Sequence, residues 1–76
     1  MGQKNLPLAS GEAHAKAFER CGWTRRKTGN HIILMRDGYI ATLSVPNHKQ
    51  VKRGTLQKLI EASEMTEEEY LACFHG

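Results

Sequence analysis

One histidine, His31, is surrounded by residue types that could support acid–base chemistry. It follows the turn residues Gly29 and Asn30 and directly precedes the apolar run 32–34. The basic segment Arg25–Lys27 comes shortly before the turn. Imidazole has an ordinary pKa near neutrality, so it can accept or donate a proton under cellular conditions. Among cations, His31 is therefore a candidate general acid or base acting on a phosphodiester. The alternative is a surface histidine at the end of a strand.

Charge is distributed unevenly along the chain, which has 76 residues and a formal net charge of +3. Between positions 20 and 58, nine cations accompany a single acid, Asp37, whereas positions 61–69 hold five glutamates and no cation. This segregation predicts a polyanion-binding surface on one side of the fold, the alternative being a solvated surface without a partner. The acidic segment could screen the basic surface, oppose a partner or simply be solvated.

Length and composition indicate a single globular domain, residues 1–76, with an irregular N-terminal arm at 1–9 and the folded part at 10–76. A chain of this length buries only about 60% of its extended surface, so a partner is common. No apolar run approaches the roughly 20 residues that cross a membrane, and the polar start is no signal peptide, which favours the cytoplasm. Cys21 and Cys73 lie far apart without a C-x-x-C motif, and we predict free thiols in a reducing compartment.

Three strands are predicted in the middle of the chain from alternation and from a short buried apolar run. They are expected at residues 23–27, 31–36 and 39–45. Asp37 and Gly38 form a typical two-residue hairpin turn between the second and third strands. Pro46 ends the third strand, and residues 46–50 form a loop.

Helices are predicted on both sides of these strands. Ser10 is a typical N-cap for the first helix, and the second begins near Arg53 or Gly54. Thr66 and Glu69 form a capping box for a short third helix. The fold class is therefore α+β: a two-layer sandwich with a three-stranded antiparallel sheet and helices on one face. This α-β-β-β-α order, with its extra C-terminal helix, is analogous to that of double-stranded RNA-binding domains.

The other histidines and the aromatic residues are interpreted as structural. His14 lies on the apolar stripe of the first helix and is expected to be partly buried, whereas His75 is expected to be exposed without a role. For Trp23 and Tyr39, packing is preferred over stacking on bases. The histidines and cysteines lack metal-ligand spacing, so no metal site is predicted.

Four short motifs resemble those of one family, the HicA or YcfA-like toxins of bacterial toxin–antitoxin pairs. They are Ser10-Gly11 before a helix ending in Cys21-Gly22-Trp23, Arg26-x-x-Gly29-Asn30-His31, Val45-Pro46-x-His48, and Gly54-Thr55-Leu56 with Ile60 and Ala62. These motifs occur in the family's order and cover about residues 9–74. Asn30 stands where the family usually has serine, and Ile32 stands where many members have a second histidine.

The resemblance implies an mRNA interferase, a toxin that cleaves RNA without cofactor or metal and is inhibited by a HicB-like antitoxin. His31 would be the catalytic histidine. RNA carries a 2′-hydroxyl beside each phosphodiester, so cleavage requires proton transfers and cations near the phosphate. The predicted substrate-binding residues are Arg26, Lys27, Gly29, Asn30, His48, Lys49 and Lys52. His48 is the other candidate proton carrier, although phosphate contact or ordering of its loop is preferred.

Two other functions remain open on the sequence. The chain could be a non-catalytic RNA-binding module that uses the same basic surface. It could also be a small interaction domain that only pairs with an antitoxin-like protein. RNA cleavage in the presence of EDTA would separate the enzyme from both alternatives.

Overall fold

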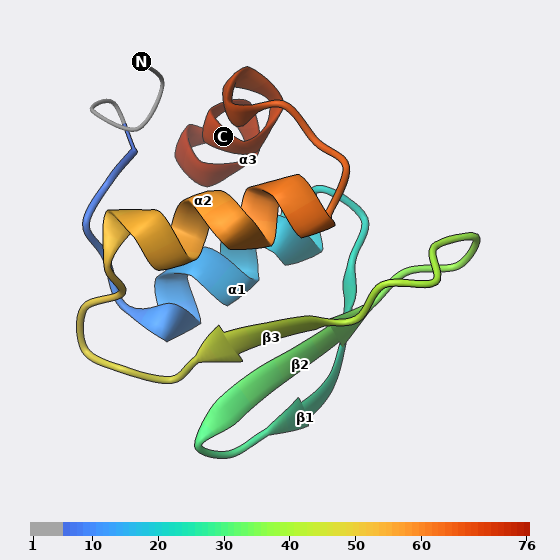
Figure 1. Cartoon of the computed structure of the whole chain (residues 1–76), viewed down its shortest axis with the longest axis horizontal. Helices are drawn as coiled ribbons and strands as arrows, with labels where there is room; N and C mark the ends of the chain where they lie inside the picture. The colour runs from blue at the N-terminus through green and yellow to red at the C-terminus, as the bar shows by residue number, and fades with distance from the viewer. Residues whose placement is uncertain (1–5) are drawn as a thin grey trace.

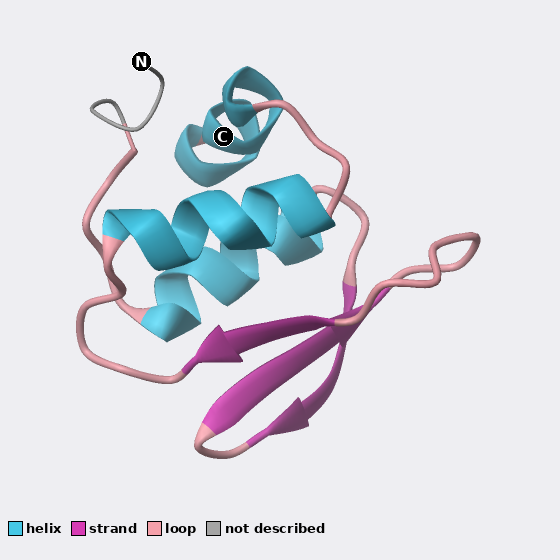
Figure 2. Cartoon of the chain, viewed as in Figure 1, coloured by secondary structure: helices cyan, strands magenta, loops and turns pink. Residues whose placement is uncertain are grey.

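Figure 1 shows helices covering one face of an antiparallel sheet, with a further helix beyond them. The structure is a computed structural model that describes residues 6–76. Its elements are α1 (Gly11–Arg20), β1 (Thr24–Thr28), β2 (His31–Met35), β3 (Leu43–Pro46), α2 (Arg53–Ala62) and α3 (Glu67–His75). The sheet has the order β1-β2-β3, and α3 packs mainly against α1. The predicted α+β class is confirmed, with the helices on one face of the sheet (Figure 2).

The described part of the N-terminal arm is irregular but packed, while residues 1–5 lie outside the described residues. Leu6 is 1% exposed and joins the core. Its carbonyl oxygen accepts a hydrogen bond of 2.8 Å from Arg53 Nε at the start of α2. Ala9 forms an antiparallel bridge with Val51. These contacts bring the chain into α1 at a defined point beside the loop that precedes α2.

The predicted helix caps are confirmed. Ser10 Oγ accepts a hydrogen bond of 3.1 Å from the Ala13 amide, which satisfies one free donor of the first turn of α1. Thr66 Oγ1 accepts from the Glu69 amide at 3.0 Å, and Glu69 Oε1 accepts from the Thr66 amide at 2.8 Å. The capping box therefore starts α3 as the sequence indicates.

The third strand begins four residues later than predicted. Asp37 and Gly38 do occupy the centre of a turn, in which the Tyr39 amide donates to Arg36 O at 3.1 Å. Pairing resumes only at Leu43, which lies opposite Leu34. This register leaves more residues on the β3 side of the turn than on the β2 side, so the ladder cannot continue directly from it. Residues 36–42 instead form a loop that projects from the sheet (Figure 1).

The core lies between the sheet and the helices. Phe18 of α1 is fully buried and packs edge-to-face against Trp23, with ring centroids 6.5 Å apart. Tyr39 also contacts Trp23, at 5.5 Å between ring centroids. Trp23 is 3% exposed, so its ring has a packing role. The interpretation of both aromatic residues as packing residues agrees with these contacts.

The prediction of two free thiols was wrong, because Cys21 and Cys73 form a disulfide. Their Cα atoms lie 5.8 Å apart although 52 positions separate them in the sequence. The bond joins the C-terminal end of α1 to α3. Arg20 reinforces the same junction by donating to the carbonyl oxygens of Cys73 at 3.1 Å and Phe74 at 3.4 Å. Nothing local in the sequence indicates that α3 folds back onto α1, so the pairing could not be predicted.

A buried histidine also fastens α3 to α1. His14 is 0% exposed, and its Nδ1 lies 2.6 Å from the hydroxyl oxygen of Tyr70, which is equally buried. The other ring nitrogen of His14 is buried without a hydrogen-bond partner. Burial lowers the pKa of His14 to about 4 and raises the pKa of Tyr70 above its usual range. The predicted structural role of His14 agrees with this environment, and its burial is complete.

The buried imidazole makes stability depend on pH. The unfolded chain binds a proton at the ordinary histidine pKa of about 6.5, whereas the folded chain resists protonation until about pH 4. The free energy of unfolding should therefore be highest above pH 6.5 and fall by up to about 3 kcal/mol as the pH drops toward 4. Urea unfolding at a series of pH values would measure this. A His14→Gln variant should lose most of this pH dependence of stability, and a His75→Gln control should keep it. The same pH dependence in the wild type and both variants would show that His14 is not its source.

Candidate functional site

His31 is the first residue of β2 and lies on the face of the sheet that the helices leave uncovered. Its neighbours Ile32 and Leu34 are 0% exposed and face the helices. Side chains alternate along a strand, so His31, Ile33 and Met35 lie on the opposite, outer face. His31 is exposed there, and Pro46 of β3 lies opposite it across the ladder. The imidazole is therefore accessible at one end of an open sheet surface.

The basic segment before His31 is divided between the two faces of the sheet. A bulge between Arg25 and Lys27 places Arg25 opposite Leu34 and Lys27 opposite Ile33. Cross-strand partners share a face, so Arg25 lies on the helix side and Lys27 lies on the outer face. Arg26 is exposed and lines a shallow surface depression that also includes Met35, toward the end of β2 away from His31.

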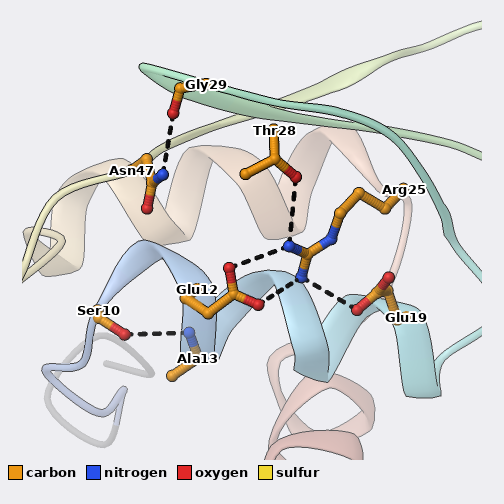
Figure 3. A network of polar contacts seen from close by, with 8 residues as sticks. All are labelled: Ser10, Glu12, Ala13, Glu19, Arg25, Thr28, Gly29 and Asn47. Atoms are coloured by element: carbon orange, nitrogen blue, oxygen red, sulfur yellow. Dashed lines mark hydrogen bonds and ion pairs between the residues drawn. The ribbon is translucent and has the colours of Figure 1, made fainter.

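Arg25 forms ion pairs with two glutamates, which connect β1 to α1 (Figure 3). Its guanidinium contacts Glu12 at 2.8 Å and Glu19 at 3.2 Å, both on α1. Hydrogen bonding to Glu12 raises the pKa of Arg25, and the same contact lowers the pKa of Glu12. Among residues 6–76 these are the ion pairs observed, so Arg26 and Lys27 keep unpaired charges. Of the three cations in this segment, the two that were predicted to bind substrate are thus the ones without an ion pair.

The turn at residues 29–30 is attached to the loop after β3. Asn47 Nδ2 donates to Gly29 O at 2.9 Å, and the Asn47 amide donates to Asn30 O at 3.0 Å. Both turn residues are exposed, and a side chain at Gly29 would meet no atom within 4 Å. The turn is therefore exposed next to His31, although both of its carbonyl oxygens are hydrogen-bonded to Asn47.

The loop after β3 carries the remaining predicted site residues. His48 and Lys52 line one surface depression together with Pro46, the residue paired with His31. Lys49 is exposed in the same loop. Pro46 thus connects His31, its partner across the ladder, with the depression that His48 and Lys52 line. Lys27 lies on the outer face of β1, and Arg26 is displaced along that strand.

Gly11 holds this loop against α1, a role that sequence reasoning missed. Its amide donates to His48 O at 2.9 Å. A Cβ at Gly11 would overlap the carbonyl oxygen of Pro46, so this close approach requires glycine. A glycine in the first turn of a helix, where no positive φ is needed, was the one available signal. For Asn47 the sequence offered no signal, since its partners lie 17 and 18 positions earlier.

The acidic segment lies away from the site. Most of its glutamates are on α3 or in the turn before it, and α3 contacts α1 and α2 on the side of the helix layer remote from the strands (Figure 1). It therefore does not cover the outer face of the sheet. Within residues 6–76, no group of three histidine, cysteine or acidic side chains is placed to hold a metal ion. In the same range no helix is long and apolar enough to cross a membrane.

Fold and site together define a small α+β protein with a histidine and several cations at one end of an open sheet. A family model described as the HicA toxin of bacterial toxin–antitoxin systems matches residues 12–65. The match includes the sheet, α2 and all but the start of α1, which is more than half of the chain. The protein belongs to the HicA family and is a toxin of a toxin–antitoxin system. A search of curated proteins gives no match.

The tight packing at Gly11 predicts a position-specific effect of adding one methyl group. Gly11→Ala should lower the free energy of unfolding by about 1–3 kcal/mol, because the new Cβ collides with the Pro46 backbone. Gly54→Ala is the matched control, since nothing lies within 4 Å of a Cβ there and alanine favours the helix. It should be neutral or slightly stabilising. Urea denaturation of both variants measures the difference, and equal stabilities would refute the close approach.

Proposed function

We propose that this HicA toxin is an endoribonuclease, an mRNA interferase that works without a metal and uses His31 to transfer the proton. The observation that carries the proposal is the position of His31, exposed on the helix-free face beside an unpaired lysine. Lys27 lies on the same face of the neighbouring strand, and the His48 loop begins at the residue opposite His31. An RNA strand laid on this face would meet a proton carrier and cations together.

The chemistry follows from the structure of RNA. His31 removes the proton from a 2′-hydroxyl, and the resulting oxyanion attacks the adjacent phosphorus. The bond from phosphorus to the 5′-oxygen breaks, and that oxygen leaves with a proton from the imidazolium or from water. The products are a 2′,3′-cyclic phosphate and a 5′-hydroxyl. In this proposal Lys27, His48 and Lys52 stabilise the charge on phosphate, with Arg26 and Lys49 binding flanking phosphates.

The same face is the proposed binding surface for an antitoxin. Membership of a toxin–antitoxin family implies an antitoxin partner. We propose that it is HicB-like and covers the outer face of the sheet. That face carries both apolar and charged side chains, which supports this proposal. Met35 is 46% exposed and lines the same depression as Arg26. A partner that buries this apolar side chain would also block the approach of RNA to His31.

The proposed place of action is the cytoplasm, where mRNA is found. Cellular reductants would act on the Cys21–Cys73 disulfide there. That bond lies at the C-terminal end of α1, whereas Gly11 and the His48 loop lie at its N-terminal end. The helix between them is about 15 Å long, so the site does not depend on the bond directly.

Substitution of His31 tests the enzymatic proposal. His31→Ala should lower the RNA cleavage rate by about 10²–10⁴-fold, because the general acid–base group is removed. The wild-type rate should be unaffected by EDTA. The matched control is His75→Ala, which removes an exposed histidine of α3 remote from the sheet. Gel assays on RNA and growth of cells expressing each variant provide the measurements. Unaltered cleavage by His31→Ala would refute the assignment, and salt-sensitive binding without cleavage would favour a binding module.

The cations should contribute by neutralising phosphates. Lys27→Gln and Lys52→Gln should each weaken RNA binding and reduce the salt dependence of the affinity, by about 0.9 in the log–log slope for every duplex phosphate left without its lysine. Lys16→Gln is the charge-matched control, because Lys16 lies on α1 beside Phe74 of α3, away from the sheet. Fluorescence titration at several salt concentrations measures the slopes. An equal effect of all three substitutions would indicate attraction by net charge and not a defined surface.

A further inference from the structure

Asn47 forms the side-chain link between two segments that carry candidate site residues. It is the first residue after β3, and it lies between Pro46, which pairs with His31, and His48. Figure 3 shows its amide group pointing at the turn before His31. Nδ2 donates to Gly29 O at 2.9 Å, and the backbone amide donates to Asn30 O at 3.0 Å. One residue thus holds both carbonyls of the turn.

The loop that contains Asn47 is itself fixed from the opposite side. The next carbonyl, that of His48, accepts a hydrogen bond from the Gly11 amide at 2.9 Å. Gly11 also packs directly against Pro46 and Asn47 without room for a Cβ. Residues 46–48 are therefore held between the start of α1 and the turn at 29–30. The loop therefore cannot move freely relative to α1. Because Asn47 bonds the loop to the turn, the turn is also held in place relative to α1.

The turn at 29–30 needs such a bond, because packing does not hold it. Residues 28–31 are all exposed, and Gly29 has open space where a side chain would be. The backbone bond from Asn47 to Asn30 survives any substitution of the side chain. The bond to Gly29 is the part that depends on the asparagine amide. Removing that bond leaves the Gly29 carbonyl without its partner, so the turn is then held only by the backbone bonds from the Gly29 amide to His31 O, at 3.2 Å, and from the Asn47 amide to Asn30 O.

We infer that Asn47 is a positioning residue that fixes the His31 imidazole relative to the His48 loop, so that both act at one phosphodiester. This inference rests on the proposed ribonuclease function and deepens it. Asn47 acts through the backbone of Gly29 and Asn30, which sets the start of β2. It is not assigned a contact with the reacting atoms. Small displacements of a catalytic group can lower a rate by large factors, so the absence of one hydrogen bond here has kinetic consequences.

The test is Asn47→Ala in steady-state RNA cleavage. We expect kcat to fall about ten-fold while KM stays within about two-fold, because the lysines that bind phosphate are untouched. His75→Ala is again the control, since it truncates an exposed polar side chain of α3 that touches neither the loop nor the turn. It should leave both constants unchanged. Urea unfolding should show that Asn47→Ala keeps its stability within about 1 kcal/mol of the wild type.

A double substitution separates positioning from other roles. If Asn47 acts through His31, adding Asn47→Ala to His31→Ala should change the residual rate by less than about two-fold. An unchanged kcat in Asn47→Ala, or a further ten-fold reduction in the double variant, would overturn the inference while leaving the proposed function intact. A rise in KM at constant kcat would overturn it as well, making Asn47 an RNA-binding residue. Wild-type cleavage by His31→Ala, or no cleavage by the wild type, would overturn both.

Discussion

The register between β2 and β3 is the constraint on which the arrangement of the site depends. Ile32 lies opposite Val45, Leu34 lies opposite Leu43, and all four side chains are 0% exposed. Because side chains alternate along a strand, burying this set leaves His31 on the outer face. A slip of one residue would bury the imidazole and expose the core, so the buried side chains fix the face of the sheet on which His31 lies. The same register brings Pro46, and therefore the following loop, next to the histidine.

A single bulge decides which cations face outward. Without it, Arg25 and Lys27 would share one face of β1, since they are two residues apart. The irregularity between them turns Arg25 toward Glu12 and Glu19 and leaves Lys27 outside. Arg25 thereby holds β1 to α1, while Lys27 on the outer face keeps its charge free of an ion pair. The division explains how one of three adjacent cations serves the structure while the others keep their charge for the proposed anionic ligand.

Helix α3 lies outside the matched part of the HicA family, which ends at Met65. It is attached by the His14–Tyr70 contact, by the Cys21–Cys73 disulfide and by Arg20. All of these contacts involve α1, and none involves the sheet. The acidic charge of α3 is therefore kept on the side opposite the candidate site, where it does not oppose an approaching polyanion at close range.

The fold class, the helix caps and the burial of Ile32 and Leu34 could all be predicted from the amino-acid order, although Ile33, predicted to be buried with them, lies on the outer face. Each of these depends on residues within a few positions of one another, so propensity and periodicity suffice. Only the folded chain reveals that Cys21 meets Cys73, that Arg25 turns inward, and that β3 begins at Leu43. The same is true of Gly11 and Asn47, which fix the loop beside His31.

The contacts that only the folded chain reveals join segments that are far apart in the sequence. Their geometry is set by how the helices pack on the sheet. Periodicity and spacing report which side of an element is apolar, but they do not report which distant element will cover it. Lys27, Gly29 and Asn30 were predictable neighbours of His31, because they closely precede it in the chain. The contacts that hold them in place were not, because they form only when α1, the turn at 29–30 and the loop after β3 come together.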